Sequence, residues 1–172
     1  MKIDLNRTSE DFSQRLDLED SPEALELKAD GVTFDKPVRV ELLVSKNKDQ
    51  LVCQGKVTVS VKLECSRCLA GYDHTVTSDL NFVVDLTGGP EAAESEEEGY
   101  FVADPSATSF EINDPVREAV ILSLPLKPLC SEECRGLCPH CGIDLNRSKC
   151  GCVQEETDPR WDQLKGLLKK DS

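Results

Sequence analysis

Apolar side chains occupy every second position along much of the region 38–86, with polar side chains between them. The apolar positions are even from 38 to 44, mostly odd from 51 to 63, and mostly even again from 72 to 86. A period of two predicts strands that bury one face and expose the other. Because the second and third runs are joined by a short connection at 66–71, we expect them to form one long antiparallel hairpin.

The pattern changes after residue 86, first to a segment without periodicity and then to a short helix. Residues 87–109 contain Gly, Pro and a run of acids, so we expect a mobile acidic loop there. A helix is predicted over 114–124, because Pro115 suits the first helical turn and Asn113 or Asp114 can cap it.

The C-terminal end has the features of a second helix. Asp158 can cap it, Pro159 suits its first position, and lysines stand near its end, where the helix dipole favours cations. We therefore predict a helix over 158–170. Its apolar stripe consists of Trp161, Leu164, Leu167 and Leu168.

These elements predict an α+β fold in two parts. Residues 1–125 are expected to form a mostly antiparallel strand domain, to which the first 35 residues contribute strand and the helix 114–124 is attached. Residues 126–172 are expected to form a second part, which contains a cysteine-rich segment and the C-terminal helix.

The charge of the chain restricts its partners. The net charge of the 172 residues is −13, and the stretch from Thr87 to Ile112 holds seven acidic residues and no Lys or Arg. An acidic chain does not bind nucleic acid through charge alone, but it attracts basic proteins. Ribosomal proteins are the most common basic proteins in a cell, so the composition favours a basic ribosomal protein as partner.

The sequence also predicts the compartment. The N-terminus from Met1 to Leu5 becomes charged at once, without the apolar region of a signal peptide. No stretch approaches the ~18 apolar residues of a membrane span. We therefore expect a cytoplasmic protein without membrane contact, in which clustered cysteines bind metal more often than they form disulfides.

Six of the nine cysteines lie within one short segment. Its centre, Cys138-Pro-His-Cys141-Gly142, has the spacing of a zinc knuckle, in which two thiolates reach one ion from a tight turn. Four ligands are expected per zinc ion, so a second pair must complete the site. That pair can be Cys130 and Cys134, or Cys150 and Cys152, or one cysteine from each.

A separate pair, Cys65 and Cys68, is predicted at the tip of the hairpin. Eight cysteines would make two sites of four, with Cys53 left as an ordinary core residue on an apolar strand face. Alternatively, the pair caps the hairpin or forms, with Arg67, a functional contact. One zinc ion is thus expected, and a second is an open alternative.

Catalysis is not expected. Cys-Pro-His-Cys also occurs in thiol oxidoreductases, but those enzymes place the first cysteine at a helix N-terminus inside a thioredoxin-like fold. Here Gly142 interrupts any helix directly after Cys141. The two histidines do not stand in a catalytic arrangement, and no phosphate-binding loop is present.

Five motifs follow one another along the chain: Leu63-Glu-Cys65-Ser-Arg-Cys68-Leu, an acidic spacer, the helix leading into Leu124-Pro-Leu-Lys-Pro-Leu-Cys130, the zinc knuckle, and Asp158-Pro-Arg-Trp161. This order of motifs resembles the YceD family, also known as domain of unknown function 177. The resemblance implies a role in accumulation or maturation of the large-subunit (23S) ribosomal RNA, without enzymatic activity. It also implies that some relatives lack the C-terminal cysteines and keep the pair that corresponds to Cys65 and Cys68.

The leading hypothesis is therefore a non-enzymatic factor of large ribosomal subunit biogenesis that binds a basic ribosomal protein, the 23S ribosomal RNA precursor, or both. No small-molecule substrate is expected. The alternatives are a zinc-knuckle adaptor that binds a protein unrelated to ribosomes, and a thiol-disulfide oxidoreductase that uses Cys138 and Cys141.

Overall fold

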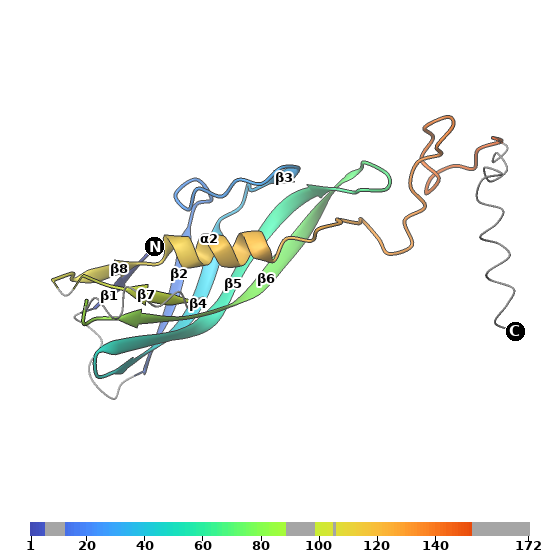
Figure 1. Cartoon of the computed structure of the whole chain (residues 1–172). Helices are drawn as coiled ribbons and strands as arrows, with labels where there is room; N and C mark the ends of the chain where they lie inside the picture. The colour runs from blue at the N-terminus through green and yellow to red at the C-terminus, as the bar shows by residue number, and fades with distance from the viewer. Residues whose placement is uncertain (6–12, 89–98, 105, 153–172) are drawn as a thin grey trace, which may run out of the picture.

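The computed structural model describes residues 1–5, 13–88, 99–104 and 106–152, and its main element is a curved, mostly antiparallel sheet of six strands (Figure 1). Five strands lie side by side in the order β2 (Ser13–Asp20), β4 (Val38–Asn47), β5 (Gln50–Glu64), β6 (Gly71–Asp85) and β7 (Tyr100–Val102). The short strand β3 (Val32–Thr33) pairs with the end of β5. The sheet and the short helix found within the described residues agree with the predicted α+β class.

The predicted long hairpin is confirmed. Strands β5 and β6 pair without interruption from Gln50 opposite Asp85 to Glu64 opposite Gly71. The alternation decides which face packs, because odd residues of β5 and even residues of β6 turn to the same side. The buried members on this side of β5 are Leu51, Cys53, Val57, Val59, Val61 and Leu63.

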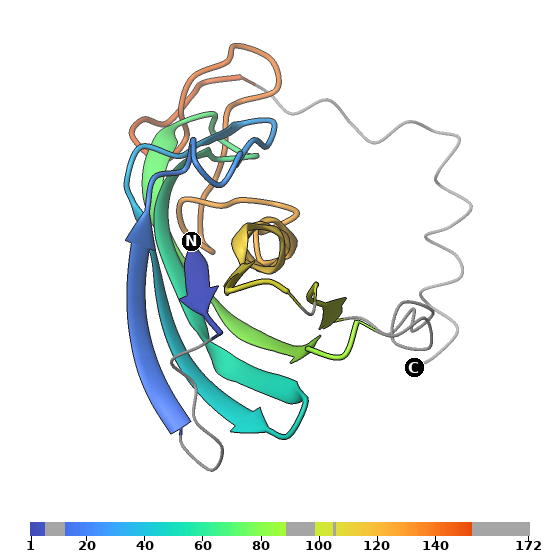
Figure 2. The ribbon, with the colours of Figure 1, turned by 90° about the vertical axis from the view of Figure 1, so that its left-hand side faces the viewer.

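The helix α2 (Asn113–Leu122) lies across the concave side of the sheet, above β5 and β6. Figure 2 shows the sheet curving around the helix. Val116 and Val120 point into the core and are fully buried. A two-stranded ribbon of β1 (Lys2–Asp4) and β8 (Ser109–Glu111) lies at the helix N-terminus. The helix predicted over 114–124 is thus confirmed and packs on the sheet through its buried residues.

The capping of α2 differs from the prediction. The N-cap residue is Ile112, and no side chain caps the helix, so neither Asn113 nor Asp114 has the predicted role. The Asn113 side chain is held by other groups: its Oδ1 accepts from the Met1 amine, and its Nδ2 donates to Glu111 at 2.6 Å. Met1 directly precedes β1 and Glu111 ends β8, and the helix pattern alone did not indicate these partners.

Strand β7 lies inside the segment 87–109 that the sequence predicted as loop, so the prediction is wrong for these residues. The strand has three residues, too few to show a period. Its stability comes from distant parts of the chain: the ring of Phe101 lies 5.8 Å from that of Phe82 and 6.0 Å from that of Phe110. Tertiary contacts, not local pattern, form this strand.

Asp85, the last residue of β6, forms hydrogen bonds with Thr87, which follows β6 in the chain, and with Tyr100, the first residue of β7. Its Oδ1 accepts from the N–H and Oγ1 of Thr87, at 2.7 and 2.5 Å, and its Oδ2 accepts from the hydroxyl of Tyr100 at 2.7 Å. Hydrogen bonds from Thr87 and Tyr100 favour the charged carboxylate and lower the pKa of Asp85 to about 2 from the ordinary 3.8.

This shift predicts an acid-dependent loss of stability. A lowered folded-state pKa stabilises the fold above the unfolded-state pKa of 3.8, and the contribution is lost as the pH falls towards 2. We expect Asp85→Asn to lower the denaturation midpoint at pH 7 and to differ little from the wild type near pH 2. Denaturant titrations at several pH values measure this. The same change at exposed Asp17 is the control, and an equal effect of both variants would contradict the prediction.

Gly55 marks a close approach of β5 to β4. A Cβ atom there would lie 2.0 Å from the backbone oxygen of Glu41 and 2.9 Å from the Cα of Leu42. Backbone atoms cannot move aside as a flexible side chain can, so Gly55→Ala is expected to destabilise the fold by about 3 kcal/mol or more. Gly71→Ala is the matched control, because a Cβ there meets nothing within 4 Å. Equal unfolding free energies of the two variants would contradict this prediction.

The C-terminal helix over 158–170 lies outside the described residues, and the division between residues 125 and 126 stays a prediction. Within the described parts of the chain, no helix combines the length and apolar character that a membrane crossing requires.

Candidate metal centres

The hairpin tip brings the first cysteine pair together. Cys65 directly follows β5, and its N–H donates to the oxygen of Ala70 at 2.9 Å. The N–H of Leu69 donates to the oxygen of Cys65, also at 2.9 Å, and Leu69 adopts a positive φ of 58°. The turn therefore closes with Cys65 and Cys68 on one side of the tip.

The segment after α2 returns to this tip and is fastened to it by hydrogen bonds. The N–H of Ser66 donates to the oxygen of Pro128 at 2.9 Å. One nitrogen of the Arg67 guanidinium donates to the oxygens of Glu132, at 3.0 Å, and Cys134, at 2.8 Å. Arg67 thus positions the segment that carries the next two cysteines.

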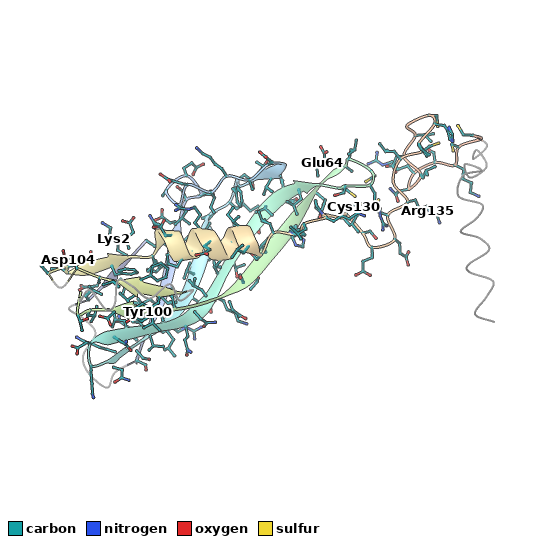
Figure 3. The ribbon with its side chains drawn as sticks, viewed as in Figure 1. Lys2, Glu64, Tyr100, Asp104, Cys130 and Arg135 are labelled. Atoms are coloured by element: carbon teal, nitrogen blue, oxygen red, sulfur yellow. The ribbon has the colours of Figure 1, made fainter. Side chains whose placement is uncertain are left out.

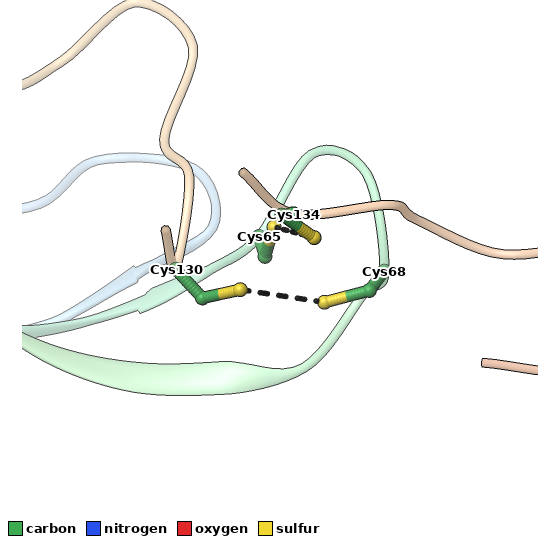
Figure 4. A group of neighbouring side chains, drawn as sticks. All are labelled: Cys65, Cys68, Cys130 and Cys134. Carbon is green, nitrogen blue, oxygen red and sulfur yellow. Dashed lines mark hydrogen bonds between the residues drawn. The ribbon is translucent and has the colours of Figure 1, made fainter. Parts of the chain in front are cut away.

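Cys65, Cys68, Cys130 and Cys134 form what we call the tip cluster (Figure 4). The Sγ atoms of Cys65 and Cys134 are 3.8 Å apart, and those of Cys68 and Cys130 are 3.7 Å apart. Ligands of a tetrahedral ion with metal–sulfur bonds of about 2.3 Å lie about 3.8 Å from each other. A disulfide would need about 2.05 Å. The tip cluster therefore has the spacing of a four-thiolate metal site.

The tip cluster is mostly buried. Cys65, Cys68 and Cys134 are buried, and Leu129 and Leu137 pack against them, whereas Cys130 is exposed. Figure 3 shows Cys130 beside the end of the hairpin, near Glu64, and Arg135 further along the same segment. Apolar cover protects a metal–thiolate site from water and competing ligands.

A second group, the outer cluster, consists of Cys138, Cys141, Cys150 and Cys152, whose sulfur atoms all lie within 4.8 Å of one another. The predicted knuckle turn is present: the N–H of Gly142 donates to the oxygen of Cys138 at 2.9 Å, and Gly142 has a φ of 72°. The Sγ atoms of Cys138 and Cys150 are 3.4 Å apart. Cys141 and Cys152 are exposed, so this cluster is more open than the tip cluster.

The two clusters are joined through Arg67 and Asn146. The oxygen of Arg67 accepts from the N–H of Leu137 at 3.1 Å, and Gly136 packs so closely that a Cβ would lie 2.9 Å from that oxygen. Asn146, in the loop of the outer cluster, donates through Nδ2 to the Sγ of Cys134 at 3.4 Å. These roles of Gly136 and Asn146 were not expected from the sequence.

The thiols within each cluster influence one another. A backbone N–H of Cys130 lowers the pKa of Cys65 to about 6, and the N–H of Cys141 does the same for Cys138. Conversely, neighbouring sulfurs raise the pKa of Cys130 and of Cys152 to about 12. Each cluster thus favours a first thiolate and resists the last, because four negative charges so close together need a cation between them.

The structure distributes the predicted site residues as follows. Among the pairings that the sequence left open, Cys150 and Cys152 join the knuckle, whereas Cys130 and Cys134 join Cys65 and Cys68. Cys53 stays apart in the core, where burial raises its pKa to about 12. The sequence indicated this grouping only through the number of cysteines, since eight of them can make two sites of four ligands each.

A family model, described as large ribosomal RNA subunit accumulation protein YceD, matches residues 53–168. The chain belongs to the YceD family. The match includes all eight clustered cysteines and confirms the resemblance that the motif order indicated. Among the described residues, it covers the hairpin from Cys53 onward, α2 and both clusters.

Curated relatives of this YceD-family chain come from bacteria and plants. An uncharacterized protein of Mycobacterium tuberculosis is 29% identical over 177 residues, which cover 100% of this chain and 83% of that protein. Large ribosomal RNA subunit accumulation protein YCED homolog 1, chloroplastic, of Arabidopsis thaliana is 27% identical over 155 residues, which cover 76% of this chain and 48% of that protein. The Zea mays protein of the same name is 26% identical, with 83% and 57% covered. No solved structure matches this chain.

Proposed function

We propose that this chain is a non-enzymatic factor of large ribosomal subunit biogenesis, which supports accumulation or processing of 23S ribosomal RNA. The observation that carries the proposal is the YceD match over residues 53–168. The plant relatives that bear the name of a ribosomal RNA accumulation protein add to it. Each cysteine cluster is part of the proposal as a zinc site.

Zinc fits both clusters better than other common ions do. Four thiolates form a soft, tetrahedral ligand set, which zinc accepts without any redox chemistry. In the proposal, Cys65, Cys68, Cys130 and Cys134 hold one ion, and Cys138, Cys141, Cys150 and Cys152 hold the other. The ions would fix the segment 130–152 to the hairpin tip and supply no catalytic step.

The charge of the chain supports a basic ribosomal protein as the direct partner. With a net charge of −13, the chain attracts basic proteins and repels the phosphates of RNA over most of its surface. The segment that carries the clusters is nearly neutral, because Lys127, Arg135, Arg147 and Lys149 stand against three acids. The proposal also includes a contact of this segment with 23S ribosomal RNA. It further includes a cytoplasmic location of the protein.

The two alternatives receive less support. In a thiol oxidoreductase Cys138 and Cys141 would react as an isolated pair, whereas here two further sulfurs lie within 4.8 Å of them. An adaptor that is unrelated to ribosomes would not need the family match that this chain shows.

Depletion and capture test the proposal together. Cells that lack the protein are expected to lose 23S relative to 16S ribosomal RNA, and the intact chain is expected to restore the ratio. Tagged protein is expected to capture precursors of the large subunit, read by mass spectrometry and RNA sequencing. A normal RNA ratio together with captures free of ribosomal components would refute the ribosomal role and favour the adaptor.

A further inference from the structure

Strand β6 is much longer than the strand that covers its outer edge. Strand β7 pairs with Val83–Asp85 alone, near one end of β6. Figure 1 shows β6 continuing beyond β7 towards the hairpin tip. Within the described parts of the chain, the outer edge from Gly71 to Phe82 therefore has no neighbouring strand.

The hydrogen bonds to β7 show which backbone groups face outward. The N–H of Val83 donates to the oxygen of Gly99, and the oxygen of Asp85 accepts from the N–H of Ala103, both at 2.8 Å. Because orientation alternates along a strand, the other odd residues direct their N–H and C=O groups to the same side. None of these groups has a backbone partner within the described residues. The residues are Asp73, Thr75, Thr77, Asp79 and Asn81.

The free edge is bordered by a groove between β6 and α2. The groove has a volume of about 240 Å³, and its apolar lining includes Leu80, Phe82 and Leu122. Leu122 is 72% exposed, although it lies on the helix that covers the sheet. A strand added to the edge would bury Leu122, because alternate side chains of that strand would point towards α2.

The charge along the edge is negative. Strand β6 contains three Asp residues and no Lys or Arg, and Glu118 adds another acid to the groove. Lysines of β5 stand across from Asp73 and Asp79 in register, but the nearer partner of Lys62 is Asp35, at 2.8 Å. The edge and the groove therefore keep an excess of negative charge.

A second copy of this chain fits the edge poorly. In a pair of two copies, odd residues of one edge must lie opposite odd residues of the other, because only these direct their backbone groups outward. If the pairing is antiparallel and uses all of Gly71–Asn81, Asp73 of each copy lies opposite Asp79 of the other. Like charges directly opposite each other destabilise a strand pair. A basic strand has no such conflict.

We propose that the outer edge of β6, from Gly71 to Asn81, accepts an extended basic segment of a partner protein as an additional strand. Basic side chains lie beside Asp73 and Asp79 on the convex face, and the alternate, apolar side chains enter the groove beside Leu122. Strand addition of this kind draws affinity from main-chain hydrogen bonds and specificity from the side-chain pockets. The inference rests on the proposed function for the ribosomal identity of the partner, and it specifies how a basic partner is held.

A synthetic peptide of about ten residues that alternates lysine and valine matches the length of the free edge and serves as the probe. With the full, zinc-loaded chain, it is expected to slow amide hydrogen exchange at Asp73, Thr75 and Thr77 by about tenfold or more. The same peptide with N-methyl groups on alternate residues keeps its charge but cannot pair. It is expected to give no protection.

Two substitutions locate the site. Thr75→Pro removes an outward N–H that the fold does not use, so the sheet tolerates it, and we expect it to weaken peptide binding about tenfold. Asp79→Lys is expected to weaken binding about threefold or more at low salt. Asp17→Lys, on β2 at the other edge of the sheet, changes the net charge equally and is expected to leave binding unchanged.

Several outcomes would overturn the inference. Binding that survives both N-methylation and Thr75→Pro would show attraction by charge alone. Protection of the odd β6 amides without peptide would show that the edge is already covered, by a second copy if it grows with protein concentration and by the chain itself if it does not. These results concern the edge alone, whereas the ratio of 23S to 16S ribosomal RNA tests the ribosomal role separately.

Discussion

Protein purified from zinc-replete cells without chelator is expected to contain two zinc ions per chain, each bonded to sulfur alone. Two groups of four sulfurs with tetrahedral spacing carry this expectation. Structural zinc in thiolate sites binds with an apparent free energy of about 10–16 kcal/mol, so the ions should survive purification. Elemental analysis gives the stoichiometry, and X-ray absorption spectroscopy gives the ligand type.

Single substitutions assign each ion to its cluster. Cys134→Ser and Cys150→Ser are each expected to reduce the content from two ions to one, because each removes one ligand from a different site. Cys53→Ala is the matched control and should retain both ions, since Cys53 lies in the core away from either cluster. One ion in the intact protein, with Cys65 and Cys68 open to thiol reagents, would contradict the tip site.

Loss of each ion is expected to loosen a different part of the chain. Cys68→Ser should release the segment 126–137 from the hairpin tip, where the bonds of Ser66 and Arg67 alone would have to hold it. Cys138→Ser should loosen residues 138–152 and leave the tip cluster loaded. Hydrogen exchange measured by mass spectrometry reports both regions, and increases of about tenfold or more are expected where a metal site is lost.

The sheet should remain folded in both variants. Its buried core contains residues of β4, β5, β6 and α2 and none of the clustered cysteines, and Cys65, Cys68 and Cys134 form a separate buried group. The denaturation midpoint of the sheet is therefore expected to change little. If Cys138→Ser abolishes the cooperative unfolding transition of the sheet, the outer cluster supports the sheet and this prediction is contradicted.

The contrast between the clusters bears on what the chain does. The tip cluster joins two segments more than 60 residues apart, as the hydrogen bond between Cys68 and Cys130 shows. It sets the position of the outer cluster relative to the hairpin through Arg67 and Gly136. A partner that contacts both the hairpin tip and the outer cluster would therefore bind one rigid surface. Loss of the metal would separate the two parts of that surface.

The sequence by itself determined the parts of this protein that depend on local regularity. The long hairpin follows from a period of two that continues through residues 51–63 and 72–86, since such a pattern can bury one face only as a strand. The helix followed from Pro115 in its first turn, and the knuckle turn followed from two cysteines separated by two residues and followed by Gly142. The motif order also indicated the family correctly.

Only the tertiary structure decided which cysteines lie together, where β7 forms, and which atoms hold Asn113 and Asp85. Spacing limits how two neighbouring cysteines can turn, but it says nothing about a partner that the fold brings from 60 residues away. Cys130 and Cys134 could reach the knuckle or the tip, and hydrogen bonds of Ser66 and Arg67 decide for the tip. Strand β7 is likewise too short for its sequence pattern to predict it. It forms because Phe101 packs against Phe82 and Phe110 in the folded chain.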